Sequence, residues 1–379
     1  MSPLAKRQLL HALPPHYRTA SRPEKTKILD AFVQATGYHR KYALSLLRHG
    51  PPPPRSRRPC PVRYDAPIVD ALRRLWEASG GLCSKRLRPF LVPLLEALDR
   101  CGEFRLPPRV KTALLQMSPA TIDRKLAPFR RHPKPRGLST TRPGSLLKPH
   151  IPIRTFAQWD DRRPGFTEMD LVAHCGESAH GEFVHTLALV DIATTWFEPQ
   201  AVPNRSQRRV FQALTTIRDR LPFPLLGLDS DNDNAFINAH LLAYCRTEHL
   251  TFTRSRDYRK NDQAHIEERN GAIIRRVIGH DRFEGEPTTA ALNAVYAVLR
   301  LWINFFQPSM RLVAKQRIGA RVRKRYDQAR TPYQRVLDAP DVAVSDKQAL
   351  RDLYLTLNPL RIREELDRCL QKLWALRRE

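Results

Sequence analysis

Residues 227–270 read GLDSDNDNAFINAHLLAYCRTEHLTFTRSRDYRKNDQAHIEERN, and their acidic residues decide how the rest of the chain is interpreted. A short apolar run, residues 225–228, ends in Asp229, Asp231 and Asp233. Thirty-five residues separate Asp231 from Glu267, which lies in the first turns of a helix that we predict to begin near residue 263. The stretch therefore predicts one set of carboxylates at a strand end and one more carboxylate on a helix.

A further carboxylate, Asp170, lies in the run FTEMDLVA at residues 166–173, which has the composition of a strand. Asp is depleted from strand interiors, and a buried charge is costly unless it is paired or bound to a metal. Each Asp taken alone is explained by a solvated strand end or a turn. Together, in a very basic chain, the carboxylates favour a shared divalent cation.

The pattern of these residues resembles the catalytic core of the retroviral-integrase (rve) superfamily, which includes retroviral integrases and bacterial insertion-sequence transposases. The family motif D-N-G-x-x-F is similar to Asp231-Asn232-Asp233-Asn234-Ala235-Phe236, and its Q-x-x-x-E-x-x-N pattern is matched by Gln263, Glu267 and Asn270. The resemblance extends over about residues 159–308. It implies an RNase H-like fold and an Asp, Asp-35-Glu triad.

Carried over residue by residue, the resemblance implies that Asp170, Asp231 and Glu267 are the catalytic and metal-binding residues, with Asp229 as a possible alternate ligand. The implied cofactor is a pair of Mg²⁺ (or Mn²⁺) ions. The implied activity is that of a DDE-type transposase, which cleaves DNA ends and transfers the strand to target DNA. Where the family has Gly the chain has Asp233, and Ala235 also departs from the pattern. An alternative is therefore a catalytically inactive, sequence-specific DNA-binding protein derived from a transposase.

Composition favours a polyanionic partner. The 379 residues include 65 Lys and Arg against 38 Asp and Glu, a formal net charge of +27. Double-stranded DNA fits such a field better than a membrane, and the resemblance implies transposon ends, target DNA and a homo-oligomer. No apolar run of about 20 residues and no signal-peptide core is apparent, which predicts a cytoplasmic, nucleoid-associated protein. Six scattered cysteines without a C-x-x-C pair argue against a disulfide framework and a zinc finger.

Two pairs of short helices precede the predicted core. Residues 24–35 and 38–48, joined at Gly37, outline a helix-turn-helix within residues 1–49. Residues 110–116 and 120–130, joined at Ser118, outline another within a second helical unit, residues 64–131. A Pro/Arg-rich linker, residues 50–63, and a basic linker, residues 132–155, are predicted to follow them.

Residues 156–309 are predicted to form an α/β core. The expected strands cover residues 166–173, 182–192, 194–202, 225–228 and 250–255, and the expected helices cover residues 206–220, 235–249 and 287–306. Residues 310–379 are predicted to form a basic, mostly helical region, with a helix over residues 350–378. The residues predicted to contact DNA are Arg40, Lys41, Arg55, Arg57, Arg58, Arg124, Lys125, Arg254, Arg256, Arg259, Lys260, Gln263, Arg269, Arg276, Arg321, Arg323 and Lys324.

Overall fold

The computed structural model describes residues 2–50, 63–130, 163–231, 233, 235–236, 238–255 and 264–377. The chain forms two compact units, Met1–Arg63 and Tyr64–Glu379. The linkers predicted over residues 50–63 and 132–155 lie almost entirely outside the described residues.

The first unit contains three helices, α1 (Pro3–Thr19), α2 (Arg22–Thr36) and α3 (Arg40–His49). α2 starts at a capping box, in which Glu24 accepts hydrogen bonds from Ser21, and ends where Gly37 takes a φ of 69°. This left-handed φ suits glycine because it has no Cβ to clash. The helices pack around Tyr17, Leu29 and Phe32. The sequence pattern predicted α2 and α3 but not α1.

The second unit opens with four helices, α4 (Ala66–Ala78), α5 (Ser84–Arg100), α6 (Pro108–Gln116) and α7 (Pro119–Leu126). The Ser118 hydroxyl caps α7 by accepting a 3.2 Å hydrogen bond from the Thr121 amide. The apolar faces of these helices belong to the same hydrophobic cluster as one face of the sheet described next. The helices and the sheet therefore share a core.

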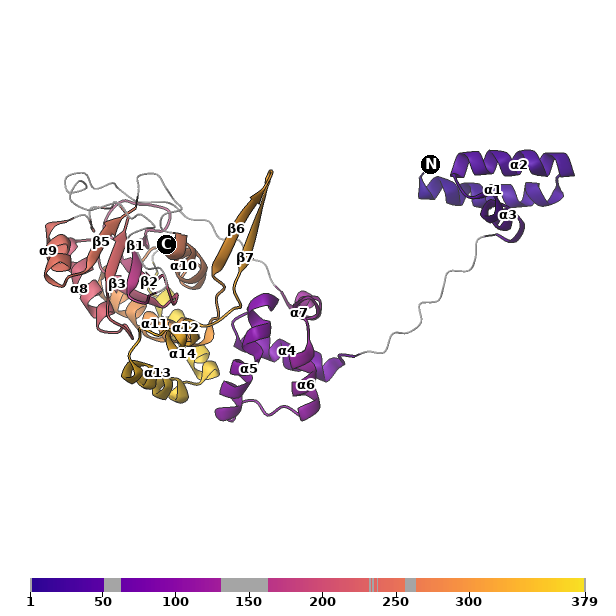
Figure 1. The fold of residues 1–379 in the computed structure, drawn as a ribbon. Coiled ribbons are helices and arrows are strands. Elements are labelled where there is room, and N and C mark those ends of the chain that lie inside the picture. The colour runs from indigo at the N-terminus through magenta and orange to yellow at the C-terminus, as the bar shows by residue number, and fades with distance from the viewer. Residues whose placement is uncertain are drawn as a thin grey trace. The chain divides into compact units, whose positions relative to one another are not determined.

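Five strands form a mixed sheet in the order β3-β2-β1-β4-β5 (Figure 1). β1 (Phe166–Ala173) pairs antiparallel with β2 (His185–Asp191), which pairs antiparallel with β3 (Phe197–Val202). On its other side, β1 pairs parallel with β4 (Gly227–Ser230), and β4 pairs parallel with β5 (Thr251–Arg254). The predicted α/β class is confirmed, and this strand order is consistent with an RNase H-like core.

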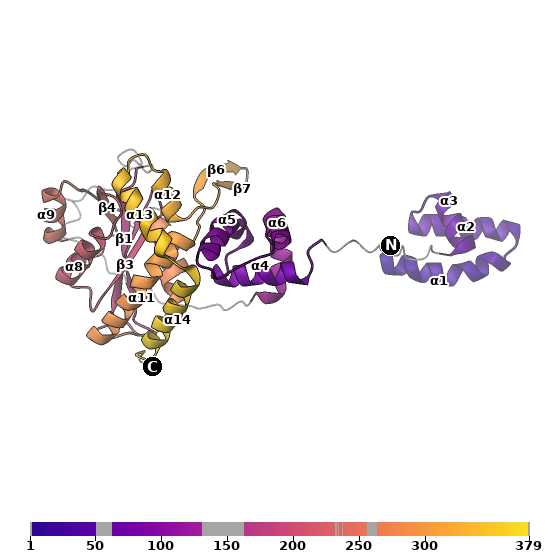
Figure 2. The ribbon, with the colours of Figure 1, turned by 90° about the horizontal axis from the view of Figure 1, so that it is seen from below.

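Helices cover both faces of the sheet (Figure 2). α8 (Gln207–Arg218) and α9 (Ala239–Thr247) pack on the face that carries Met169 and Leu187. α10 (Ala264–Arg269) and α11 (Gly285–Phe306) pack on the face that carries Val172 and Ala188. α9 starts four residues later than predicted because Asn238 caps it, accepting a 2.8 Å hydrogen bond from the Leu241 amide.

α11 is long and apolar enough, by length and composition, to cross a membrane, which differs from the prediction of no such run. Its most apolar window is 56% buried, and its residues Leu292, Val295, Leu299 and Trp302 are all buried. A core helix of a globular protein passes the same test, so α11 does not indicate a membrane.

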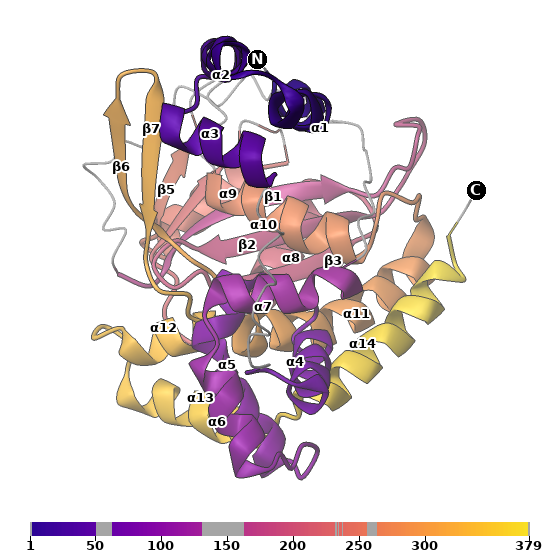
Figure 3. The same cartoon turned by 90° about the vertical axis from the view of Figure 1, so that its right-hand side faces the viewer.

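The C-terminal region combines a hairpin with three helices. β6 (Leu312–Ile318) and β7 (Arg321–Tyr326) form a two-stranded ribbon, to which the sequence analysis assigned no strands (Figure 3). α12 (Pro332–Asp338), α13 (Val344–Thr356) and α14 (Pro359–Trp374) follow. The single helix predicted over residues 350–378 is wrong, because Asn358 caps a new helix and Pro359 cannot continue the old one.

A buried ion pair joins the sheet to α11. The Glu198 side chain on β3 has no exposed surface and accepts hydrogen bonds of 2.6 and 2.7 Å from Arg300. The Trp196 indole donates a third, at 2.9 Å, and Arg220 lies 3.7 Å away. Glu198 is therefore fully satisfied only while Arg300 remains.

We expect Arg300→Leu to lower the free energy of unfolding by roughly 3 kcal/mol, because it leaves a buried carboxylate without its main partner. Chemical denaturation at pH 7 measures this change. The matched control is Arg209→Leu, since Arg209 pairs with Glu286 at the surface and such a pair contributes at most about 1 kcal/mol. Equal losses of unfolding free energy in the two variants would show that the buried Glu198–Arg300 pair stabilises the protein no more than the surface pair does.

Candidate active site

The parallel pairing of β1 with β4 brings two acidic residues side by side. The ladder runs from Phe166 opposite Gly227 to Met169 opposite Ser230. Asp170 is the next residue of β1, and Asp231 directly follows β4. Neighbours in register point to the same face of a sheet, so the ladder places these two carboxylates together at the carboxyl end of β4.

Asp170 is held by hydrogen bonds on both oxygens. Its Oδ1 accepts from the Leu171 amide at 2.8 Å, and its Oδ2 accepts from the Asn270 side-chain amide at 2.7 Å. Burial raises the pKa of Asp170 to about 6, the two hydrogen bonds oppose that rise, and the charges of Glu267 and Asp233 add to it. The negative charges of Glu267 and Asp233 therefore both act on the carboxyl group of Asp170.

Asp231 has the more strongly shifted carboxyl group. Burial raises its pKa to about 7, and the charge of Asp170 contributes next. The Asp233 amide donates a 2.9 Å hydrogen bond to Asp231 Oδ1, which lowers the pKa again. Two adjacent carboxyls that both resist ionisation will share protons near neutral pH unless a cation replaces them.

Glu168, which is not among the predicted site residues, positions the helix of Glu267. Its side chain is completely buried, and its Oε2 accepts hydrogen bonds from the backbone amides of His265 (3.1 Å) and Ile266 (2.9 Å). These are amides of the first turn of α10, where a carboxylate also interacts favourably with the helix dipole. Glu267 follows directly and is exposed. The available signal was a second acid in the same strand, two residues before Asp170.

The helix changes its winding just after Glu267. Residues Asn270–Arg275 form a π-helical segment in which the Asn270 amide reaches Asp170. Gly271 lies inside it, with nothing within 4 Å of where a Cβ would be. π-helical turns are rare and occur frequently at functional sites. Asn270, already noted as part of the motif, thus links this helix to β1.

The remaining acids of the motif are held in other ways. Asp229 is fully buried within β4, where it lies opposite Glu168 and accepts a 2.5 Å hydrogen bond from the Thr253 hydroxyl. Asp233 accepts from the Ala235 amide at 2.9 Å and lies 3.6 Å from Arg205.

The residues at the site fit a hard divalent cation by chemistry. Asp170, Asp231 and Glu267 offer only oxygen atoms, the ligands that Mg²⁺ and Mn²⁺ prefer. Asn270 Oδ1 is a buried acceptor with no hydrogen-bond partner among the described residues. Within those residues, no three acidic, His or Cys side chains are close enough together to hold an ion as they stand.

The predicted DNA contacts have different surroundings. Arg40 pairs with Asp30, Lys41 and Arg124 are exposed, and Lys125 donates to the Tyr64 carbonyl at 3.3 Å. Arg254 ends β5 and is half-buried; Arg276 is exposed, whereas Arg269, expected to point outward, is half-buried. Arg321, Arg323 and Lys324 are exposed on β7. The following lie outside the described residues: Arg55, Arg57, Arg58, Arg256, Arg259, Lys260 and Gln263.

The fold and the site define an α/β protein with a cluster of carboxyl groups at the end of two parallel strands. No protein-family model matches the chain. It is 47% identical, over 328 residues, to the uncharacterized protein y4rM of Sinorhizobium fredii (strain NBRC 101917 / NGR234), covering 86% of this chain and 93% of that protein. The chain therefore belongs to the same family as y4rM.

Among solved structures, the chain is similar to the catalytic core domain of BIV integrase. The match covers 45% of this chain and 91% of that domain, with 18% sequence identity and a TM-score of 0.28. A score this low does not by itself establish a common fold.

We expect Asp231→Asn to stabilise the protein in a pH-dependent way when divalent cations are chelated. A carboxyl whose pKa is raised on folding contributes stability below its unfolded pKa, and that contribution is lost as the pH rises toward about 7. The gain from the substitution should therefore grow by about 1.4 kcal/mol or more between pH 5 and pH 8, the value of one pKa unit.

Chemical denaturation of wild type and variant at both pH values measures this gain. Asp219→Asn is the control, because Asp219 is an exposed acid at the end of α8. A gain that is the same at pH 5 and pH 8 would contradict the assignment of a raised pKa to Asp231.

Proposed function

We propose that the chain is a DDE-type transposase that cleaves DNA ends and transfers the strand to target DNA in a metal-dependent reaction. The observation that carries this proposal is the register of β1 with β4, which places Asp170 beside Asp231, while the charge of Glu267 reaches Asp170. The sequence motifs point to the same broad class, integrase or transposase.

In this proposal Asp170, Asp231 and Glu267 hold two Mg²⁺ or Mn²⁺ ions. When bound, the ions would neutralise charge on the scissile phosphate and activate the attacking oxygen. Asn270 orients the Asp170 carboxylate through its 2.7 Å hydrogen bond. Glu168 fixes the start of α10 and so fixes the direction from which Glu267 approaches. Protons held by Asp170 and Asp231 near pH 7 must leave before a cation binds.

The basic hairpin is the surface that we propose for duplex DNA. All of its strand residues are exposed, and they include six cations and no acid. Its base is fixed by Asp327, which accepts from the Arg311 amide at 2.6 Å and pairs with Arg335 at 2.8 Å. A two-stranded ribbon fits the major groove of B-DNA, and lysine and arginine side chains displace its counterions. Figure 3 shows the ribbon extending away from the sheet.

A second candidate function is a DNA-binding protein with an inactive core. It is favoured by the separation of the acidic side chains, since no three of them form a ready-made ion site in the described part of the chain. The two candidates differ in one measurable property, the cleavage of end-bearing DNA.

We expect Asp231→Asn and Glu267→Gln each to reduce end cleavage by about 100-fold or more, the scale of losing one preorganised electrostatic group. The measurement is cleavage and joining of duplex DNA that carries the sequences flanking the gene, with Mn²⁺ present. Asp219→Asn serves as the control. If the wild type binds this DNA without cutting it, or the variants cut as fast as wild type, the transposase proposal fails.

Removing positive charges from the hairpin should weaken binding equally for DNA of any sequence. Replacing Arg321, Arg323 and Lys324 by Gln removes three cations, so the slope of log K against log salt should become shallower by roughly 2.7. Fluorescence anisotropy over a salt series measures this slope. As the matched control, Arg351, Arg368 and Lys372 on α13 and α14 are replaced by Gln, which changes the net charge equally. Equal slopes in both triple variants would mean that the hairpin does not touch DNA.

A further inference from the structure

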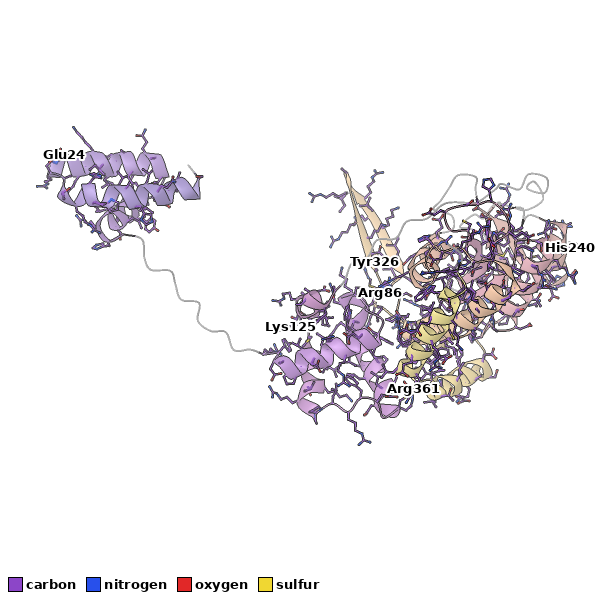
Figure 4. The ribbon with its side chains drawn as sticks, turned by 180° about the vertical axis from the view of Figure 1, so that it is seen from behind. Glu24, Arg86, Lys125, His240, Tyr326 and Arg361 are labelled. Carbon is purple, nitrogen blue, oxygen red and sulfur yellow. The ribbon has the colours of Figure 1, made fainter. Side chains whose placement is uncertain are left out.

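A cavity of about 740 Å³ lies behind the helix that carries Glu267. One wall is the turn from α4 to α5 with Trp76, Cys83 and Arg86, and the other is α10 with its π-helical continuation and the end of α11. Figure 4 labels Arg86, which projects from the start of α5. The volume is in the range of sites that bind small organic ligands.

The cavity is lined by four arginines and one acid. Arg130 is paired with Asp123, and Arg86 lies 3.9 Å from the one acid, Glu268, which is itself largely exposed. Arg86 Nε is buried and donates to nothing within the described residues. The side chains of Arg269 and Arg276 make no hydrogen bond or ion pair with the described part of the chain. Several guanidinium groups that line the cavity therefore have N–H donors without an acceptor among the described residues.

The position of Arg269 is costly without an anion. Burial lowers the pKa of Arg269 to about 10; the charge of Glu268 opposes this change, and repulsion by Arg86 and Arg335 adds to it. Arginine provides planar sets of donors that match phosphate oxygens, and a buried cation is stable only when it is paired. A bound phosphate would supply the acceptors that Arg86 Nε and its neighbours lack.

The cavity also has an aromatic, apolar side. Trp76 and Phe129 line it together with Ile303, and the Trp76 indole is fixed by a 3.0 Å hydrogen bond to the Leu82 carbonyl. The turn beside it depends on two glycines with positive φ, and a Cβ at Gly80 would lie only 3.3 Å from Trp302. Aromatic rings beside arginines are a recurrent arrangement for binding a nucleotide, with the base stacked and the phosphate ion-paired.

We propose that this cavity binds one nucleotide of a DNA strand, with its phosphate on Arg86, Arg269 and Arg276 and its base against Trp76. The choice of DNA as the polymer rests on the function proposed above. The site itself rests on the arginines, the unpaired Nε and the aromatic wall. Its position is distinct from the carboxyl cluster, because Arg269 and Arg276 line the cavity while Asn270 contacts Asp170.

Occupancy of the cavity would act on the position of Glu267. Glu268 and Arg269 line the cavity and directly follow Glu267 on a helix only six residues long. The start of this helix is held by Glu168, and its end passes into the π-helical segment. A strand bound behind the helix would fix its other side, so that strand binding and the placement of Glu267 become linked.

Cys83 provides a direct probe of the cavity. It lines the cavity and is exposed, whereas Cys101 and Cys369 are half-buried and Cys175 and Cys245 are buried. In a full-length Cys60→Ser protein, the rate of maleimide labelling at Cys83 is followed by peptide mass spectrometry. A single-stranded oligonucleotide should slow this labelling at least about fivefold at saturation, because it covers the thiol.

The variant Arg269→Gln/Arg276→Gln should raise the oligonucleotide concentration for half-protection about tenfold or more, as expected for lost charge-assisted hydrogen bonds. The control Arg246→Gln/Lys372→Gln removes the same charge from exposed positions elsewhere and should change it less than about twofold. Because Arg276 is exposed, Arg276→Gln alone tests the site even if the double variant folds poorly.

Three outcomes would overturn the inference. They are no protection by the oligonucleotide, equal protection by inorganic phosphate at the same phosphate concentration, and an equal loss in the control variant. A protein that shows arginine-dependent protection but never cleaves end DNA would keep this site and overturn the transposase function. Cleavage of end DNA without protection of Cys83 would keep the transposase function and overturn this site.

Discussion

The candidate site depends on one buried carboxylate, Glu168, and on the strand register that places it. Glu168 lies in β1 beneath α10 and accepts two backbone amides of that helix. Those amides have no partner within the helix, so a buried acceptor both satisfies them and fixes where the helix starts. The same strand carries Asp170 two residues later, on the same face. The helix with Glu267 and the strand with Asp170 are thereby joined through adjacent side chains of β1.

This arrangement explains why acidic residues accumulate in strands that would otherwise be apolar. Glu168 lies opposite Asp229, and two residues further along each chain segment Asp170 comes next to Asp231, so two alternate rungs of the β1–β4 pairing are acidic, with Met169 and Ser230 between them. The inner pair, Glu168 and Asp229, is structural. Glu168 accepts a hydrogen bond from α10, and Asp229 accepts one from the Thr253 hydroxyl. The outer rung has carboxyls whose pKa values are raised to about 6 and 7, because burial and mutual repulsion oppose ionisation. Only the outer rung has the chemistry of a cation site.

The helical unit from α4 to α7 is tied to the rest of the second unit through particular contacts. Gln307 at the end of α11 donates to the Ser79 carbonyl at 2.8 Å, and Arg100 donates to the carbonyls of Tyr354 and Leu357 at 3.1 Å. Between these contacts the cavity with Arg86 and Arg269 adjoins α10 from behind. The helix of Glu267 is thus bounded on one side by the sheet and on the other by a cationic space that the helical unit completes. A DNA-binding role for that unit would place recognition and chemistry on opposite sides of one short helix.

By itself, the sequence determined the α/β class and most strand positions, because hydrophobic runs and caps are local properties. It also predicted that Asp170, Asp231 and Glu267 form one site, and this stays a prediction. It also indicated that Gly37 ends α2 and that Ser118 starts α7. It could not identify Glu168 as the residue that holds α10, since that role requires knowing which amides lie above β1. It missed the hairpin, whose strands are exposed on both faces and carry no apolar alternation, and it placed Arg269 outward. Those features were decided by the tertiary structure, because each depends on which distant segment packs beside the residue.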